Sequence, residues 1–228
     1  MFFQPDKLRA ILAALVFLPF FSCAANDNLL YWVDFLAEFR LCEKIKLKAE
    51  QGLWYTDDRL YMEVTTLMLE WSAFDWLAIA IDDRIIDSKY NDGGKWRWKY
   101  EHCPMLDVIL KQELYGFRFD WRTRLEYRDR EAARHNNMRY RGRLRARTPW
   151  EWTGWRLSPY AYFEAFVEDK PGLGKNEMFN RSRLLFGMSM RPAKNTTLSL
   201  FYMIQHDRSA DSGWQPFHVP GMELRFGF

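Results

Sequence analysis

The residues best suited to chemistry are arginines that recur at every second position. Between Arg118 and Arg147 the sequence has 11 arginines in 30 residues. Guanidinium groups bind carboxylate or phosphate through two parallel hydrogen bonds, and a row of them concentrates positive potential. Anion recognition is therefore the first chemistry to consider. The candidate residues are Arg118, Arg122, Arg124, Arg139, Arg141, Arg143 and Arg145.

An acidic pair and a His-Asp pair offer a weaker alternative, which is that the protein is a hydrolase. Asp82-Asp83 and His206-Asp207 each follow an apolar segment, and such groups can activate a water molecule, loosely as in the omptin barrel proteases. The neighbouring segments do not otherwise match omptins, and four histidines make coincidences easy. We therefore assign no catalytic residue and do not expect an enzyme. His102 beside Cys103 lacks a visible third ligand, so we also expect no metal and no cofactor.

Strands, rather than helices, must position the arginines. In 117–130 aromatic and aliphatic residues alternate with charged ones, and 137–148 repeats this alternation. A helix would spread the arginines around its circumference, whereas a strand gathers them on one face. The sequence therefore predicts an all-β protein. Its candidate strands are 29–41, 44–55, 60–71, 76–87, 96–113, 117–130, 137–148, 157–168, 178–191, 196–207 and 217–228.

These strands are typical of a transmembrane barrel rather than a soluble sheet. Most are long enough to cross a bilayer at a tilt, and the last ends on an aromatic, Phe228. The mean hydropathy of −0.41 excludes a bundle of membrane helices, and an aromatic content of 18% excludes disorder. We predict an antiparallel up-and-down transmembrane β-barrel. Aromatic girdles are expected from Trp54, Tyr55, Trp71, Trp76, Trp96, Trp98, Trp150, Trp152, Trp155 and Tyr160.

The number of strands is the difficult point. There are 11 candidates, but single-chain bacterial barrels have an even number. Short turns near 72–74, 114–116 and 192–195 alternate with longer loops at 88–95, 168–177 and 207–215, which leaves 29–41 running the wrong way. Either 29–41 lies outside a barrel of 10 strands, or 96–113 breaks at Pro104 to give 12. We favour 12.

The first 24 residues read as an export signal. Lys7 and Arg9 precede an apolar run over 11–21, and small residues follow it. We expect cleavage after Ala24 or Ala25, which leaves 25–228 as a single barrel domain with a net charge of about +2. Lipidation of Cys23 is the alternative. Whether Cys42 and Cys103 pair in the exported protein stays open.

The order of elements also resembles a known family. Arg122-Thr123-Arg124-Leu125-Glu126-Tyr127-Arg128 is followed by Ser158-Pro159-Tyr160 leading to Glu164, then by Asn180-Arg181-Ser182-Arg183 before Gly187 and an aromatic terminal strand. In these motifs 31–228 is similar to the outer-membrane barrels of domain of unknown function 2490. The resemblance implies a location in the cell outer membrane. It brings no established activity and no catalytic residues.

Function must then be sought inside the barrel. An arginine facing lipid at mid-depth costs about 2–4 kcal/mol, so the arginine rows must face the lumen. Lys44, Lys46 and Lys48 form another basic row. We predict an arginine-lined lumen that passes small anionic solutes; the alternative is a closed structural barrel whose charges pair with one another. The other expected partners are outer-membrane lipid and the barrel-assembly machinery, which would read the Phe228 strand. Nucleic acid is not expected for an exported chain.

Overall fold

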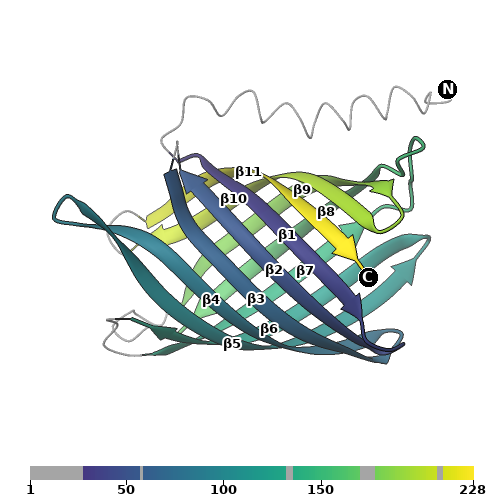
Figure 1. Ribbon diagram of the computed structural model, residues 1–228, viewed down its shortest axis with the longest axis horizontal. Coiled ribbons are helices and arrows are strands. Elements are labelled where there is room, and N and C mark those ends of the chain that lie inside the picture. Colours follow the sequence, from purple (N-terminus) through teal and green to yellow (C-terminus); the bar gives the residue numbers. More distant parts are fainter. Residues whose placement is uncertain (1–27, 57–58, 132–135, 170–177, 210–212) are drawn as a thin grey trace.

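The computed structural model is a closed barrel of 11 strands (Figure 1). It describes residues 28–56, 59–131, 136–169, 178–209 and 213–228, so the expected signal segment and Cys23 lie outside the described residues. No helix among the described residues could span a membrane. The strands are β1 (Leu30–Arg40), β2 (Ile45–Thr56), β3 (Arg59–Phe74), β4 (Leu77–Asp92), β5 (Lys95–Leu114), β6 (Phe117–Arg130), β7 (Asn137–Arg147), β8 (Ser158–Glu168), β9 (Phe179–Ala193), β10 (Thr196–Ser209) and β11 (Gly213–Gly227).

The barrel closes through a parallel pairing of β1 with β11, which we call the seam. The ladder runs from Trp32 opposite Gly221 to Glu38 opposite Gly227, and the Arg40 N–H extends it with a hydrogen bond of 3.1 Å to the Phe228 carbonyl. Every other neighbouring pair is antiparallel. An odd number of hairpin-linked strands brings the first and last strands together in parallel, and that ladder still satisfies the backbone.

The expected strand counts of 10 and 12 are therefore both wrong in the part of the chain that the structure describes. Segment 29–41 is not excluded, because it forms β1. Nor does β5 break at Pro104, which lacks an N–H donor. The β5–β6 ladder is interrupted between His102 and Met105, but β4 pairs with β5 without a gap and holds the strand together.

Two turns show why the expected alternation of loop lengths is only partly right. Ser88–Asp92 belongs to β4, and Gly93 and Gly94 alone connect it to β5. Both glycines have positive φ, 58° and 88°, which a two-residue hairpin turn requires and other residues rarely adopt. At the opposite end of the barrel, the β7–β8 connection takes ten residues, 148–157. We call the end where β1 begins the amino end and the end where β11 finishes the carboxyl end.

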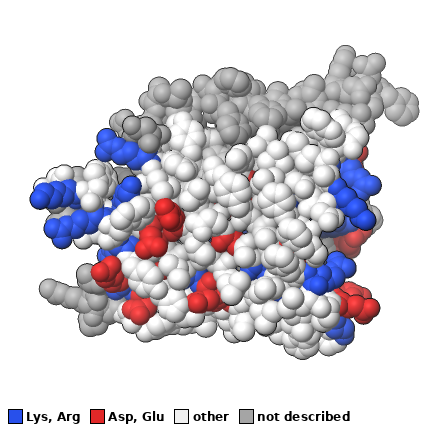
Figure 2. Space-filling view, in the orientation of Figure 1, with Lys and Arg blue, Asp and Glu red and all other residues white. Residues whose placement is uncertain are grey.

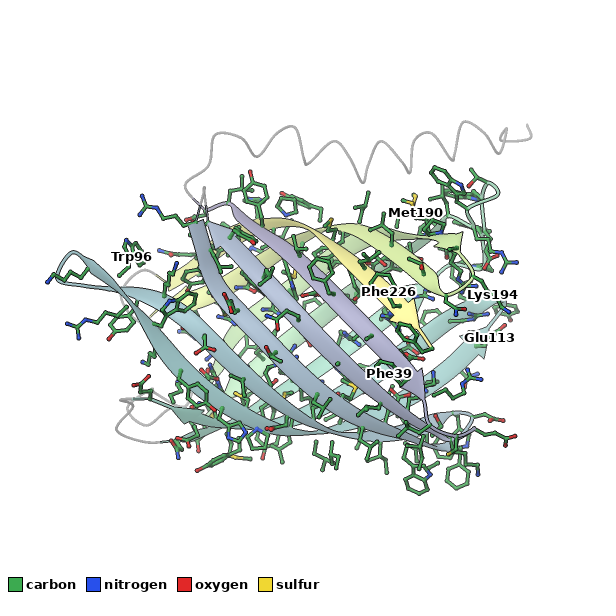
Figure 3. The ribbon with its side chains drawn as sticks, viewed as in Figure 1. Phe39, Trp96, Glu113, Met190, Lys194 and Phe226 are labelled. Atoms are coloured by element: carbon green, nitrogen blue, oxygen red, sulfur yellow. The ribbon has the colours of Figure 1, made fainter. Side chains whose placement is uncertain are left out.

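The outer wall is apolar and carries aromatic residues near its ends. Figure 2 shows that most of the middle of one face is uncharged, with a few Asp and Glu side chains within it and Lys and Arg gathered at both ends. Phe39 and Phe226 lie toward the carboxyl end and Trp96 lies at the amino end (Figure 3). Trp71, Trp76, Trp98, Trp150 and Trp155 are also exposed, as the girdle prediction requires. Three residues correct it: Trp54 and Tyr160 line the lumen, and Trp152 is buried.

The lumen is filled by two kinds of side chain. One half is an apolar cluster formed by Trp54, Leu185, Phe201, Met203 and Val219. The other half is charged and comes mainly from β4 to β9. The barrel therefore has a packed interior in which polar groups must find partners within the protein.

The seam gives a test of strand number. Ala37 and Phe226 are paired across it, and neighbouring strands lie about 4.8 Å apart, a spacing that a disulfide can bridge. In a Cys42→Ser, Cys103→Ser background, we expect Ala37→Cys with Phe226→Cys to form an internal disulfide on mild oxidation, seen as a mobility change on non-reducing gels. Ala37→Cys with Leu69→Cys is the matched control, since β2 separates β1 from β3. A ten-strand barrel without β1 would cross-link neither pair.

Candidate functional site

The strands β6 and β7 turn their arginines inward, as the alternation predicts. Trp121, Tyr127, Tyr140 and Leu144 are exposed on the outer wall. The side chains between them are buried in the lumen, and the deepest arginine, Arg124, has an exposed fraction of 0%. Because the sequence period is two, one face of these strands supplies the membrane surface and the other supplies the charge.

Arg124 is held between two carboxylates from neighbouring strands. Its Nη2 donates to Asp82 of β4 at 2.5 Å and to Asp107 of β5 at 2.7 Å, and its Nε donates to Asp107 at 2.6 Å. All three side chains are fully buried. A buried charge is tolerated only with such close partners, so this cluster is a fixed part of the wall.

A second cluster joins β6, β7 and β8. Arg141 donates to Glu126 at 2.6 Å and to Glu164 at 2.9 Å, and Arg122 donates to the same Glu164 oxygen at 2.9 Å. Arg139 donates to the other oxygen of Glu126. Three arginines thus share two carboxylates, which leaves the cluster with one more positive than negative charge.

The amino end of the lumen repeats this arrangement. Arg128 grips Glu101 with two hydrogen bonds of 2.5 and 2.7 Å and also reaches Glu168 at 2.6 Å. Arg130 donates to Glu168 at 2.5 Å. On the opposite wall Arg181 pairs with Asp207 through two bonds of 2.6 and 2.8 Å. Each of these arginines is thus paired with at least one carboxylate.

The arginines toward the carboxyl end are less well neutralised. Arg145 donates to Asp120 at 2.5 Å, whereas Arg118 is exposed and lies 3.7 Å from Glu113. Arg143 and Arg147 lie within ion-pair distance of no carboxylate among the described residues, and their Nε–H groups have no acceptor. Of the seven predicted residues, six line the interior, and Arg118 lies outside the cavity at its carboxyl end. Arg147 is one of seven further arginines that line the cavity and that the prediction omitted.

A cavity of about 690 Å³ runs through these groups. Leu30, Thr56 and Ser88 line it toward the amino end, and Arg147 and Thr197 line it toward the carboxyl end. Thirteen arginines and six carboxylates contribute to its lining, so positive charge predominates along the wall. This cavity is the candidate functional site.

Comparison with known proteins places this barrel in a family. The family model described as "Protein of unknown function (DUF2490)" matches residues 31–215. The chain belongs to the DUF2490 family. The resemblance noted in the arginine and Ser-Pro-Tyr motifs is thereby confirmed.

A solved structure supports the same fold for this DUF2490 chain. LpxR from Salmonella typhimurium, an outer-membrane β-barrel, is similar with a TM-score of 0.53 at 11% sequence identity, over 85% of this chain and 87% of that chain. At this identity the similarity concerns the fold alone, an outer-membrane-type β-barrel. No curated protein matches the DUF2490 chain.

The residues of the hydrolase alternative are not brought together in the DUF2490 barrel. Asp82-Asp83 lies in the middle of β4 rather than at a strand end, because β4 continues to Asp92. Asp82 is buried in the lumen against Arg124, whereas Asp83 is on the outer wall, 2.6 Å from His102. Asp207 lines the cavity, and the strand alternation turns its neighbour His206 outward.

Metal ligation and cysteine pairing can be assessed for the described residues. They hold no group of three or more His, Cys, Asp and Glu side chains that could bind a metal ion. Cys42 is exposed and Cys103 is buried, and both are free thiols. The Cys103 thiol donates to Glu101 at 2.9 Å.

The Arg124 cluster predicts a large and specific loss of stability. Arg124→Gln leaves Asp82 buried without its ion-pair partner and leaves Asp107 with only the longer contact of 3.7 Å to Arg122, and breaking such a buried pair costs about 3–5 kcal/mol. Arg118→Gln is the matched control, since an exposed pair is worth about 0–1 kcal/mol. Urea unfolding of the detergent-folded protein, followed by the gel shift between folded and boiled samples, measures both. Equal losses for the two variants would contradict the role given to the cluster.

Proposed function

We propose that this DUF2490 barrel lies in the outer membrane and that its lumen is a narrow pathway for small anions. The observation that carries the proposal is the cavity, whose lining reaches from the amino to the carboxyl end with thirteen arginines against six carboxylates. In a wall of low dielectric an unbalanced row of guanidinium groups attracts anions and repels cations. The export signal expected at residues 1–24 and the exposed aromatic residue Phe228 agree with this location.

The arginines of the lumen would have two different roles. Arg122, Arg124, Arg139 and Arg141 are engaged by carboxylates and would form a rigid wall. Arg143 keeps donors available and, with Arg145 and Arg147, would set the selectivity toward the carboxyl end. Passing anions would exchange hydration water for these donors without breaking the ion pairs behind them.

A closed structural barrel is the second candidate. It is favoured by the complete burial of the Arg124 cluster and by the chain of ion pairs that ties β4 through β9 together across the lumen. In such a barrel the paired charges would serve folding alone. The two candidates differ in one measurable property, the conductance of the folded protein.

The outer membrane also supplies the expected partners. Exposed aliphatic and aromatic side chains on β3, β4, β5 and β9 suit lipid contact, and the terminal strand, with exposed Met222, Phe226 and Phe228, suits recognition by the barrel-assembly machinery. Deleting Phe228 is expected to reduce insertion into the outer membrane.

Planar lipid bilayers test the pathway. We expect the folded chain to conduct, with a reversal potential in a KCl gradient that reports preference for chloride. Arg143→Gln combined with Arg147→Gln should reduce the ratio of anion to cation permeability several-fold, because two positive charges leave a low-dielectric wall. Lys194→Gln, at an exposed turn, is the matched control and should change nothing.

Three results would count against the pathway. Absence of conductance from protein that still shows the gel shift of a folded barrel would favour the closed structural barrel. Cation preference would contradict the role of the arginines. Unchanged selectivity in the double variant would remove Arg143 and Arg147 from the pathway.

A further inference from the structure

The cavity holds two arginines on β7 that lie within ion-pair distance of no carboxylate in the part of the chain that the structure describes. The Arg143 guanidinium lies over the ring of Tyr162, with 5.5 Å between its central carbon and the ring centroid, and its Nε–H has no acceptor. Arg147 lies two alternate positions further along the same strand, and its Nε–H also lacks an acceptor. A buried donor without a partner costs about 1–3 kcal/mol, which a bound acceptor would recover.

The same cavity holds two carboxyl groups that lie within ion-pair distance of no arginine or lysine among the described residues. Asp34 of β1 is 7% exposed and accepts a hydrogen bond of 2.5 Å from the Trp32 indole, a neutral donor. Glu50 of β2 lies next to it, so the two carboxyl groups form an acidic pair. Arg84 of β4 acts on Asp34 from a distance, since it donates to Thr66 at 2.9 Å and lies outside ion-pair distance of Asp34.

A glycine holds Asp34 in this position. Gly52 is paired with Asp34 across the β1–β2 ladder, and a Cβ at Gly52 would come within 2.7 Å of the Asp34 carboxylate. The carboxylate therefore occupies the space that a side chain would fill. Asp34 is fixed close to the wall, with its carboxyl group lining the cavity.

These two sets of charges face each other across the barrel. In the closed strand order, β7 is five strands from β1 in one direction and five strands from β2 in the other. Arg143 and Arg147 thus lie on the wall opposite Asp34 and Glu50, and all four line one cavity. Apolar side chains of Trp54, Phe201 and Leu185 fill the space beside them.

We propose that the lumen binds a small zwitterion, with a carboxylate or phosphate at Arg143 and Arg147 and an ammonium group at Asp34 and Glu50. The proposal deepens the anion pathway by naming its solute class. A simple anion pairs with the arginines but is repelled by the acidic pair Asp34 and Glu50. A dipolar solute can pair with the arginines and with the acidic pair at the same time. The opposed charges also orient the solute across the barrel.

Titration calorimetry on the full chain folded in detergent tests this inference. The probes are glycine, 4-aminobutyrate and 6-aminohexanoate, each compared with the carboxylate and the amine of the same carbon number, so that the series covers the width of the lumen. We expect at least one zwitterion to bind about tenfold more tightly than its matching carboxylate, the difference expected for one added charge pair.

Two double variants separate the two walls. Asp34→Asn with Glu50→Gln should abolish the advantage of the zwitterion over the carboxylate while carboxylate binding is kept or improved. Arg143→Gln with Arg147→Gln should weaken zwitterion and carboxylate alike by about tenfold. Asp129→Asn, on the exposed face of β6, is the matched control and should change neither. The gel shift on boiling checks that each variant is folded.

The outcomes distinguish this inference from the pathway itself. If no zwitterion of the series binds more tightly than its carboxylate, the inference is overturned even when the bilayer measurements show anion selectivity. If binding has the expected preference but the folded protein does not conduct, the pathway fails and the site stands as a binding site. Loss of zwitterion preference in the Asp129→Asn control would also overturn the assignment.

Discussion

The burial of Arg124 is the constraint on which the rest of the lumen depends. The wall of a membrane barrel is one residue thick, so a charged side chain that does not face lipid must find its partners inside. Asp82 and Asp107 supply them from two neighbouring strands. From this contact a chain of shared carboxylates continues through Glu126 and Glu164 to β8 and β9, and it ties the inner faces of these strands together.

This framework decides which charges remain for function. Arginines that share a carboxylate are held in place and contribute little to the net electric field in the lumen. Arg143 and Arg147 do not share one among the described residues, so they keep their contribution to this field. The apolar cluster around Trp54 and Phe201 narrows the rest of the interior. What is left is a small cavity whose unbalanced charges lie on opposite walls. The shape and the polarity of this cavity both follow from the packing of the ion pairs and the apolar cluster around it.

The sequence predicts much of this fold but little of the pairing. Alternation alone locates the strands and turns Arg124 inward, since side-chain direction in a strand is a local property. The partners are not local: Arg122 and Glu164 are 42 residues apart, as are Arg124 and Asp82, so only the closed sheet brings them together. Trp54 lies an even number of residues from Lys48, so it could have been placed on the same, lumen-facing side of the strand. Its position near a strand end suggested an aromatic girdle instead.

The parallel seam has a consequence for how the barrel is made. In a barrel with an even number of strands, both chain ends lie on the side from which the protein is inserted. Here Leu30 and Phe228 lie at opposite ends, so the first strand must be carried across the bilayer before it can meet the last one. These partners are also the most distant in sequence, and contacts of that separation form slowly. Closure of the seam is thus the slow step of assembly. Until it is complete, the open barrel depends most on a helper protein that keeps β1 and β11 available for pairing.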